Sequence, residues 1–178
     1  KNKISEMDEK VVNGFGGFYG YSKLLAENIF EHYRCEGLKI VILRPSSIYG
    51  HGLPSKKLIT NYLNKAKNGG VIDILQPDNK INLIHAYDVA RAALLAYDSK
   101  SWGVFNIGAT SYSVADVANM AIKISGKGEI SVAEADQKYE PFNRFDLDFT
   151  LANASFGYQP IIDLEEGMKL IMLGRERG

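Results

Sequence analysis

The sequence has too little cysteine, clustered histidine and net charge for several common functional classes. Its single cysteine, Cys35, excludes an internal disulfide framework and a zinc site built from cysteines. The three histidines, His32, His51 and His85, are too widely separated for the spacing of metal ligands, so no metal site is predicted. Lys and Arg number 21 against 21 Asp and Glu, and we therefore expect no nucleic-acid partner.

Long apolar runs and targeting patterns are also missing. No run approaches the roughly 20 residues that a membrane-spanning helix needs, so we expect no membrane association. The sequence begins at Lys1 without methionine and without the pattern of a secretory signal peptide, which favours a cytoplasmic location. We expect either a processed protein or a piece of a longer one.

What the sequence does contain is typical of a globular α/β protein. The 178 residues are 46% hydrophobic and 24% charged, enough for one sizeable core. Periodicity predicts helices over 19–36, 55–67, 88–97, 113–125 and from 163, strands over 38–43, 71–75, 82–85, 104–107 and 130–133, and irregular chain over 137–160. Strands that alternate with helices predict a largely parallel sheet. No internal boundary is evident, so 1–178 is treated as one unit.

Several polar residues are predicted to cap these helices. Ser55 and Asp88 each stand at the expected start of a helix. Ser113 and Asp116 have the spacing of a capping box, with Gly126 as the stop signal. Asp163 is likewise predicted to cap the start of the last helix. We expect His85, just before Asp88, to tie a turn to backbone groups rather than to act in catalysis.

The pair of residues with the clearest chemical meaning is Tyr19 and Lys23. They stand four apart at the expected start of a helix and therefore share one face. A free tyrosine, with a pKa of about 10, is too weak a base at neutral pH, and a nearby ammonium favours its phenolate. Lowering such a pKa to about 7 takes roughly 4 kcal/mol. The pair suits a general acid/base that moves a hydroxyl proton. Alone, the pattern also fits an exposed Tyr and Lys on a surface helix.

Further motifs follow in order along the chain. They are YGYSKLLAE at 19–27, RPSSIYG at 44–50, NLIHAYDVA at 82–90, GVFNIG at 103–108 and FGYQP with LEEG at 156–167. Together they resemble the extended short-chain dehydrogenase/reductase family, the NAD-dependent sugar epimerases and dehydratases. The resemblance implies a Rossmann-like NAD(P)-binding fold with a small substrate-binding lobe.

The resemblance covers only the second half of the family's pattern. Members begin with a strand and a glycine loop that admits the pyrophosphate to a helix N-terminus. Residues 14–20 spell GxGxxxG, but the preceding ISEMDEKVVN is not a buried strand, so we interpret them as a loop. We therefore expect the C-terminal part of a subunit, with the glycine-loop half absent and this chain alone inactive.

By the same resemblance, the motifs assign roles to individual residues. Tyr19 is the acid/base, and Lys23 activates it and contacts the ribose. Pro45, Ser46, Ser47 and Ile48 are expected beside the nicotinamide. Ser47 stands at the usual Asn position, so it is also a candidate substrate contact. Where the family often has a phosphate-binding arginine, this chain has Ile81 beside Lys80, and Arg144 is the other candidate contact.

The resemblance implies an NAD(P)-dependent epimerase or dehydratase acting on a sugar, in particular a nucleotide-linked one. Tyr19 would accept a hydroxyl proton while hydride passes to the cofactor, NAD being favoured over NADP. Epimerase, dehydratase and reductase chemistry remain open at this point. The parent protein is expected to be a homodimer that associates through Leu25 and Ile29. The alternative is a non-catalytic fragment or interaction module that retains half of the active site.

Overall fold

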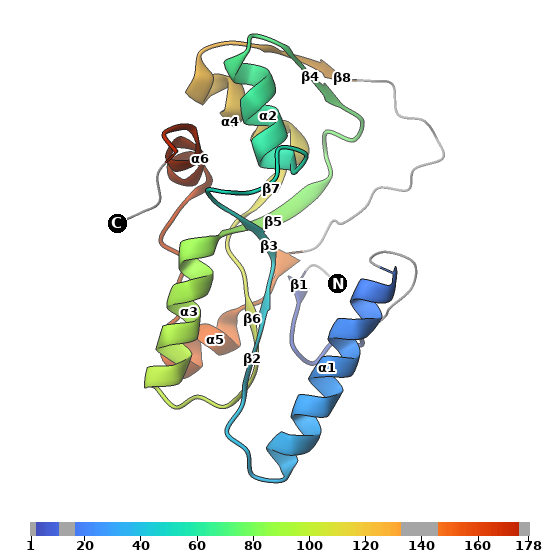
Figure 1. The fold of residues 1–178 in the computed structure, drawn as a ribbon, viewed down its shortest axis with the longest axis vertical. Coiled ribbons are helices and arrows are strands. Elements are labelled where there is room, and N and C mark those ends of the chain that lie inside the picture. The colour runs from blue at the N-terminus through green and yellow to red at the C-terminus, as the bar shows by residue number, and fades with distance from the viewer. Residues whose placement is uncertain (1–2, 11–16, 133–145, 175–178) are drawn as a thin grey trace.

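The structure, a computed structural model, describes residues 3–10, 17–132 and 146–174 (Figure 1). Its helices are α1 (Gly17–Cys35), α2 (Leu58–Lys67), α3 (Ala86–Asp98), α4 (Val114–Ser125), α5 (Thr150–Phe156) and α6 (Leu164–Met172). Its strands are β1 (Lys3–Ile4), β2 (Val41–Pro45), β3 (Ser47–Tyr49), β4 (Val71–Ile74), β5 (Lys80–His85), β6 (Gly103–Ile107), β7 (Ser111–Ser113), β8 (Glu129–Val132) and β9 (Asp146–Leu147). None of the helices in these ranges is long and apolar enough to cross a membrane.

The strands form four small sheets rather than one continuous sheet. The pairs β1–β9, β2–β6, β3–β5 and β4–β8 are parallel, and β7 adds to β5 in the antiparallel direction. The prediction of largely parallel pairing is therefore confirmed. The longest parallel register runs from Val41↔Gly103 to Pro45↔Ile107, and it brings the ends of β2 and β6 to the same edge.

Two hydrophobic clusters flank this edge. One gathers residues of α2, β4, α4 and α6, with Leu63, Ile72 and Met168 among its buried members. The other joins β6 to α3 and α5, with Phe105 and Tyr158 at its centre. Figure 1 shows the first cluster's elements in the upper part of the molecule and β2, β6, α3 and α5 in the lower part. The ends of β2 and β6 thus lie between the two hydrophobic clusters.

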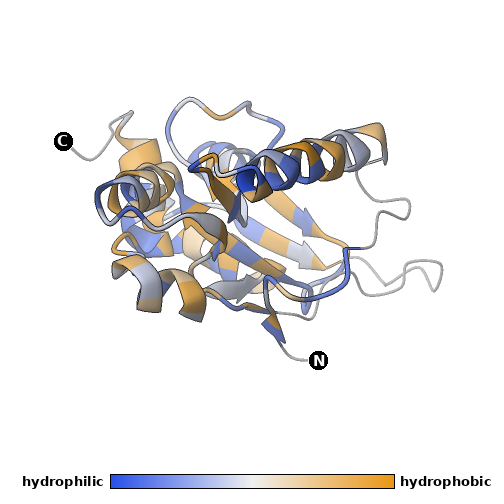
Figure 2. Ribbon diagram, turned by 90° about the horizontal axis from the view of Figure 1, so that it is seen from below, coloured by the Kyte–Doolittle hydropathy of each residue, from blue (hydrophilic) through white to orange (hydrophobic). Residues whose placement is uncertain are grey.

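Helix α1 is attached differently. None of its 19 residues is buried, and Leu25, Ile29 and Tyr33 are 61%, 48% and 52% exposed. Figure 2 shows hydrophobic residues along the length of this helix as well as on the strands. The four-residue apolar periodicity predicted the helix correctly, but Leu25 and Ile29 remain about half exposed, and Tyr33 lines a cavity with Ile40 and Val41.

Three expectations about helix boundaries are wrong. Helix α2 begins after Lys57, and no side chain caps it, so Ser55 is not its cap. His85, not Asp88, is the N-cap of α3, because its Nδ1 accepts a hydrogen bond from Tyr87 N at 3.2 Å. Residues 150–156, expected to be irregular, form α5, which buries Ala152 and Phe156.

Candidate functional site

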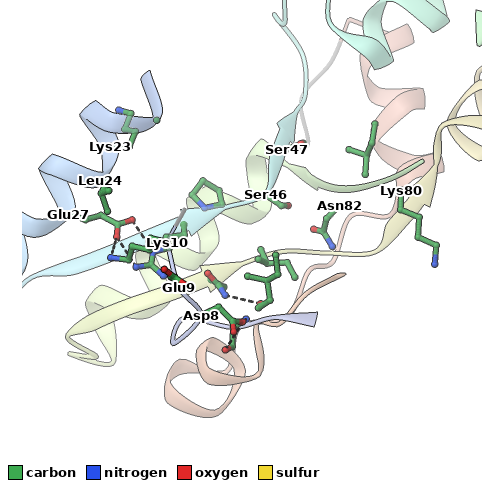
Figure 3. Close-up of a pocket in the computed structure, with 18 residues that line it drawn as sticks. Asp8, Glu9, Lys10, Lys23, Leu24, Glu27, Ser46, Ser47, Lys80 and Asn82 are labelled. Carbon is green, nitrogen blue, oxygen red and sulfur yellow. Dashed lines mark hydrogen bonds and ion pairs between the residues drawn. The ribbon is translucent and has the colours of Figure 1, made fainter. Parts of the chain in front are cut away.

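A cavity of about 460 Å³ lies where α1 faces the strand ends. Gly20, Lys23, Leu24 and Glu27 of α1 line one side, and residues 44–47 at the end of β2 line another. The start of β5, residues 80–82, and the segment 4–10 complete most of the wall. Figure 3 shows Lys23, Leu24 and Glu27 on α1 across from Ser46, Ser47 and Lys80. The volume lies within the range of small-molecule and cofactor sites.

Tyr19 and Lys23 share one face of α1, as their spacing predicts. Lys23 Nζ lies 5.2 Å from the centroid of the Tyr19 ring, a cation–π contact. The two differ in their relation to the cavity: Lys23 lines it, whereas Tyr19 does not and is 68% exposed. Tyr19 occupies the first turn of the helix, so its phenol stands beyond the rim of the cavity.

The strand end at 45–48 divides between two cavities. Pro45, Ser46 and Ser47 line the first one, whereas Ile48 lines a neighbouring cavity of about 260 Å³. Ser46 N donates to Ile107 O at 2.9 Å, which extends the β2–β6 register by one residue and fixes the backbone here. Ser46 Oγ is buried and has no hydrogen-bond partner among the described residues. A buried hydroxyl without a partner is costly unless something binds it.

The two cavities share a wall made by Ser47 and Ile81. Lys80 lines the first cavity, and its charge contributes to lowering the pKa of Asp116, chiefly lowered by the hydrogen bond with Ser113. Most residues that line the second cavity are hydrophobic, and Lys57, the residue that precedes α2, adds a cation to its wall. Arg144, the other predicted phosphate contact, lies outside the described residues. Of the two predicted phosphate contacts, Lys80 is therefore the one that the structure describes, and it lies in the wall of the first cavity.

Glu27 carries the main polar link between α1 and the strand end. Arg44 Nε and Nη2 donate to its two carboxylate oxygens at 2.9 and 2.7 Å, and Lys10 Nζ donates at 2.7 Å. Partial burial by itself would raise the pKa of Glu27, but the hydrogen bonds and charges of Arg44 and Lys10 outweigh it. The pKa of this carboxyl therefore lies below its ordinary value.

Arg44 and Asn106 connect this link to the floor of the cavity. Arg44 Nη1 donates to Glu6 O at 3.3 Å, and the Glu6 carboxylate accepts from Asn106 N at 2.8 Å. Asn106 is 2% exposed, and its Nδ2 donates to Ile4 O at 3.3 Å and Asp148 O at 3.1 Å. This amide therefore joins β6 to the segments around β1 and β9.

Sequence reasoning assigned no role to Glu27, Arg44 or Asn106, although all three stand in the quoted motifs. Glu27 follows Lys23 by four residues, one helical turn along the same face, which is a signal that could have been used. Arg44 directly precedes Pro45 in the strand end. Their partners are 17 or more residues away, and spacing alone does not reveal such contacts.

Known proteins resemble this chain both in sequence and in structure. The sequence pattern of the "NAD dependent epimerase/dehydratase family" matches residues 6–108. A protein of Methanocaldococcus jannaschii named "Putative UDP-glucose 4-epimerase" is 30% identical over 161 residues, which cover 86% of this chain and 52% of that protein. The family match begins at residue 6, so it does not by itself assign the chain to the C-terminal part of the family's pattern.

Solved structures show the same architecture. The UDP-glucose 4-epimerase of Thermotoga maritima, determined with UDP-glucose, superposes with a TM-score of 0.76 at 25% identity, covering 93% of this chain and 59% of its own. The UDP-glucuronic acid 4-epimerase of Bacillus cereus, determined with UDP-glucuronic acid and NAD, has a TM-score of 0.75 at 22% identity, covering 95% and 55%. The chain spans roughly half to three fifths of the length of these proteins. The Rossmann-like α/β fold is confirmed, and the chain belongs to the NAD dependent epimerase/dehydratase family.

Proposed function

We propose that this chain carries the acid/base and nicotinamide-side part of an NAD-dependent epimerase/dehydratase that acts on a nucleotide-linked sugar. One observation carries the proposal: Lys23, Ser46, Ser47 and Lys80 surround a single cavity, with Tyr19 one helical turn from Lys23. These residues come from three elements that are distant in sequence. Their convergence is unexpected for an exposed Tyr and Lys on a surface helix, the alternative that the sequence left open.

Tyr19 acts as the acid/base in this proposal. Its phenol is exposed beside the cavity, so a substrate hydroxyl can reach it. The ammonium of Lys23 lies 5.2 Å from the ring centroid and places a positive charge beside this side chain. Tyr49 is unsuited to the role, because burial raises its pKa and its hydroxyl donates to Asp163 O at 3.1 Å.

The wall of the cavity fits the nicotinamide end of the cofactor. Ser46 Oγ, buried without a described partner, has the capacity to donate to or accept from a carboxamide. Lys23 and the strand end Pro45–Ser47 would hold this end. When bound, the cofactor supplies the hydride acceptor and donor for a sugar carbon. The family is NAD dependent, and we propose NAD rather than NADP for this chain.

The substrate class follows from the second cavity. Ser47 and Ile81 line both cavities, so one ligand can extend from the first into the second. Lys80 and Lys57 add positive charge to the two walls, which suits a diphosphate between a sugar and a nucleoside. The Thermotoga maritima relative was determined with UDP-glucose. We propose a UDP-sugar, with the sugar in the first cavity.

Replacement of Tyr19 tests this function. In the natural protein that carries this sequence, Tyr19→Phe should reduce turnover of the UDP-sugar by at least about 10²-fold, the usual effect of losing a general acid/base. The matched control is Tyr21→Phe, because Tyr21 is similarly exposed but has Leu25 at the next turn. Equal turnover in the two variants, both folded, would contradict the assignment.

A second candidate, a non-catalytic interaction module, is favoured by the exposed apolar side chains of Leu25 and Ile29 on α1. The comparison of Tyr19→Phe with Tyr21→Phe distinguishes the two, and calorimetric titration of this 178-residue chain with NAD tests whether the chain by itself forms the cofactor site. For the chain alone we expect no saturable binding in the micromolar range, because dinucleotide affinity depends largely on a glycine loop at a helix N-terminus. Saturable binding would show that the chain by itself forms the cofactor site.

We also propose that the protein associates as a homodimer through α1. The exposed Leu25 and Ile29 lie one turn apart on this helix, with Tyr33 next in the row. Removing such side chains from water is favourable. Light scattering should show a dimer, and Ile29→Lys should shift it toward monomer. A monomer at high protein concentration would contradict the proposal.

A further inference from the structure

The way in which α1 is held against the rest of the protein points to a role for Glu27 and Arg44. The stripe of α1 that is least exposed comprises Gly20, Leu24, Glu27 and Glu31, at one-turn spacing. An amphipathic helix normally packs through an apolar stripe, but this stripe offers one large apolar residue. Between α1 and the other described elements, the side-chain hydrogen bonds and ion pairs all converge on Glu27.

We infer that Glu27 and Arg44 are a positioning pair that fixes α1, and with it Tyr19 and Lys23, relative to the strand end Pro45–Ser47. The pair is bidentate, with two nearly parallel donors from one planar guanidinium. Such a fork fixes orientation as well as distance, which a lysine point charge does not. Both side chains are about four-fifths shielded, at 21% and 19% exposure, so water competes weakly.

The location of the pair makes it a direct connection between the two halves of the proposed site. Glu27 follows Lys23 by one helical turn, and Arg44 is bonded covalently to Pro45. The third nitrogen of Arg44 is held by Glu6 O, so the guanidinium cannot rotate freely. Movement of the carboxylate therefore changes the separation between Lys23 and Ser46. A displacement of about 1 Å in a catalytic group can cost about 10²-fold in rate.

The inference rests on the proposed function only where it names Tyr19 and Lys23 as the acid/base pair. Its test needs neither cofactor nor turnover, so the two can fail separately. Spin labels at Phe18→Cys and Leu94→Cys, in a Cys35→Ser background, report the distance between the first turn of α1 and α3. Phe18 and Leu94 are 88% and 64% exposed, so labels at these positions displace no packed side chain.

We expect one narrow distance distribution in this labelled parent. Glu27→Gln and Arg44→Lys should each shift and broaden it while the protein remains folded by circular dichroism. The matched control is Glu31→Gln, one turn along the same helix, which removes only the exposed pair with Arg34 and should leave the distribution unchanged. A contribution to overall stability alone would lower the melting temperature without moving the labels.

Unchanged distributions in Glu27→Gln and Arg44→Lys would overturn the inference. If Glu27→Gln broadens the distance distribution but Arg44→Lys keeps the width of the parent, the requirement for the guanidinium fork is refuted. If Glu27→Gln fails to fold, Glu27→Asp serves in its place, because it keeps the charge and shortens the side chain by one methylene. The fork then cannot close at the parent's separation, so the same shift is expected, and its absence would again overturn the inference.

Discussion

Asp88 offers the sharpest test of how the fold is held together. It is fully buried, and its carboxylate accepts from Ile161 N at 3.1 Å and Ile162 N at 3.0 Å. Arg91 Nη1 also donates to this carboxylate, at 3.1 Å, and to Gln159 O. One side chain of α3 therefore anchors the backbone of the segment that leads into α6.

The size of the stability loss on replacing Asp88 separates this anchoring function from the helix cap that its sequence position predicts. Loss of an N-cap costs about 1 kcal/mol. Asp88→Ala instead leaves two amides without their acceptor, at about 1–3 kcal/mol each. We expect a loss of about 2–6 kcal/mol, a large share of the roughly 5–15 kcal/mol that stabilises a domain.

Urea unfolding followed by circular dichroism measures this loss. With an m-value of about 2 kcal/mol/M, the midpoint of Asp88→Ala should fall by about 1–3 M at unchanged m. Asp98→Ala, an exposed carboxylate on the same helix, serves as the matched control and should differ little from the parent. A midpoint for Asp88→Ala within about 0.5 M of the parent would refute the reasoning.

Three further outcomes are expected. Gly167→Ala should destabilise the protein by about 1–3 kcal/mol in urea unfolding, because a Cβ there would stand 2.5–2.9 Å from the Tyr49 ring; unchanged stability would contradict that close approach. Glu27 has a lowered pKa in the folded state, so its contribution to stability is present above the ordinary carboxyl pKa and is lost as the pH falls below it. The stability difference between parent and Glu27→Gln should therefore shrink in acid, and a difference that grows would contradict the ion pairs. In the natural protein that carries this sequence, Ser46→Ala should raise the Kd for NAD several-fold, and an unchanged Kd would exclude Ser46 from the cofactor site.

Local features of the fold could be predicted from the sequence because their partners are close along the chain. The capping box of α4 formed as expected, with Ser113 Oγ and the Asp116 carboxylate each accepting from the other's backbone amide at 3.0 Å. Gly126 adopts a positive φ of 67° and ends the helix. The i,i+4 relation of Tyr19 and Lys23 is of the same kind, since helix geometry alone fixes it.

Features that depend on distant partners could not be predicted in this way. Asp88 reads as a cap until the donors to its carboxylate, the amides of Ile161 and Ile162 more than 70 residues away, are known. Helix α5 is short, and its N-cap residue Phe149 makes no side-chain hydrogen bond, so burial of Ala152 and Phe156 in the second hydrophobic cluster is important for its stability. The cavity itself depends on tertiary arrangement, because it joins α1 to the starts and ends of strands.

The most direct test of the central claim, that Lys23 and Tyr19 serve hydride chemistry on a nucleotide sugar, is a rapid-mixing experiment. The natural protein that carries this sequence is loaded with NAD, mixed with UDP-glucose or UDP-glucuronic acid, and followed through the absorbance of reduced nicotinamide. We predict a transient absorbance with the parent and with Tyr21→Phe, and a rate at least about 10²-fold lower in Tyr19→Phe and Lys23→Met. Equal rates in all four proteins, or no signal with either sugar in the parent, would contradict the account.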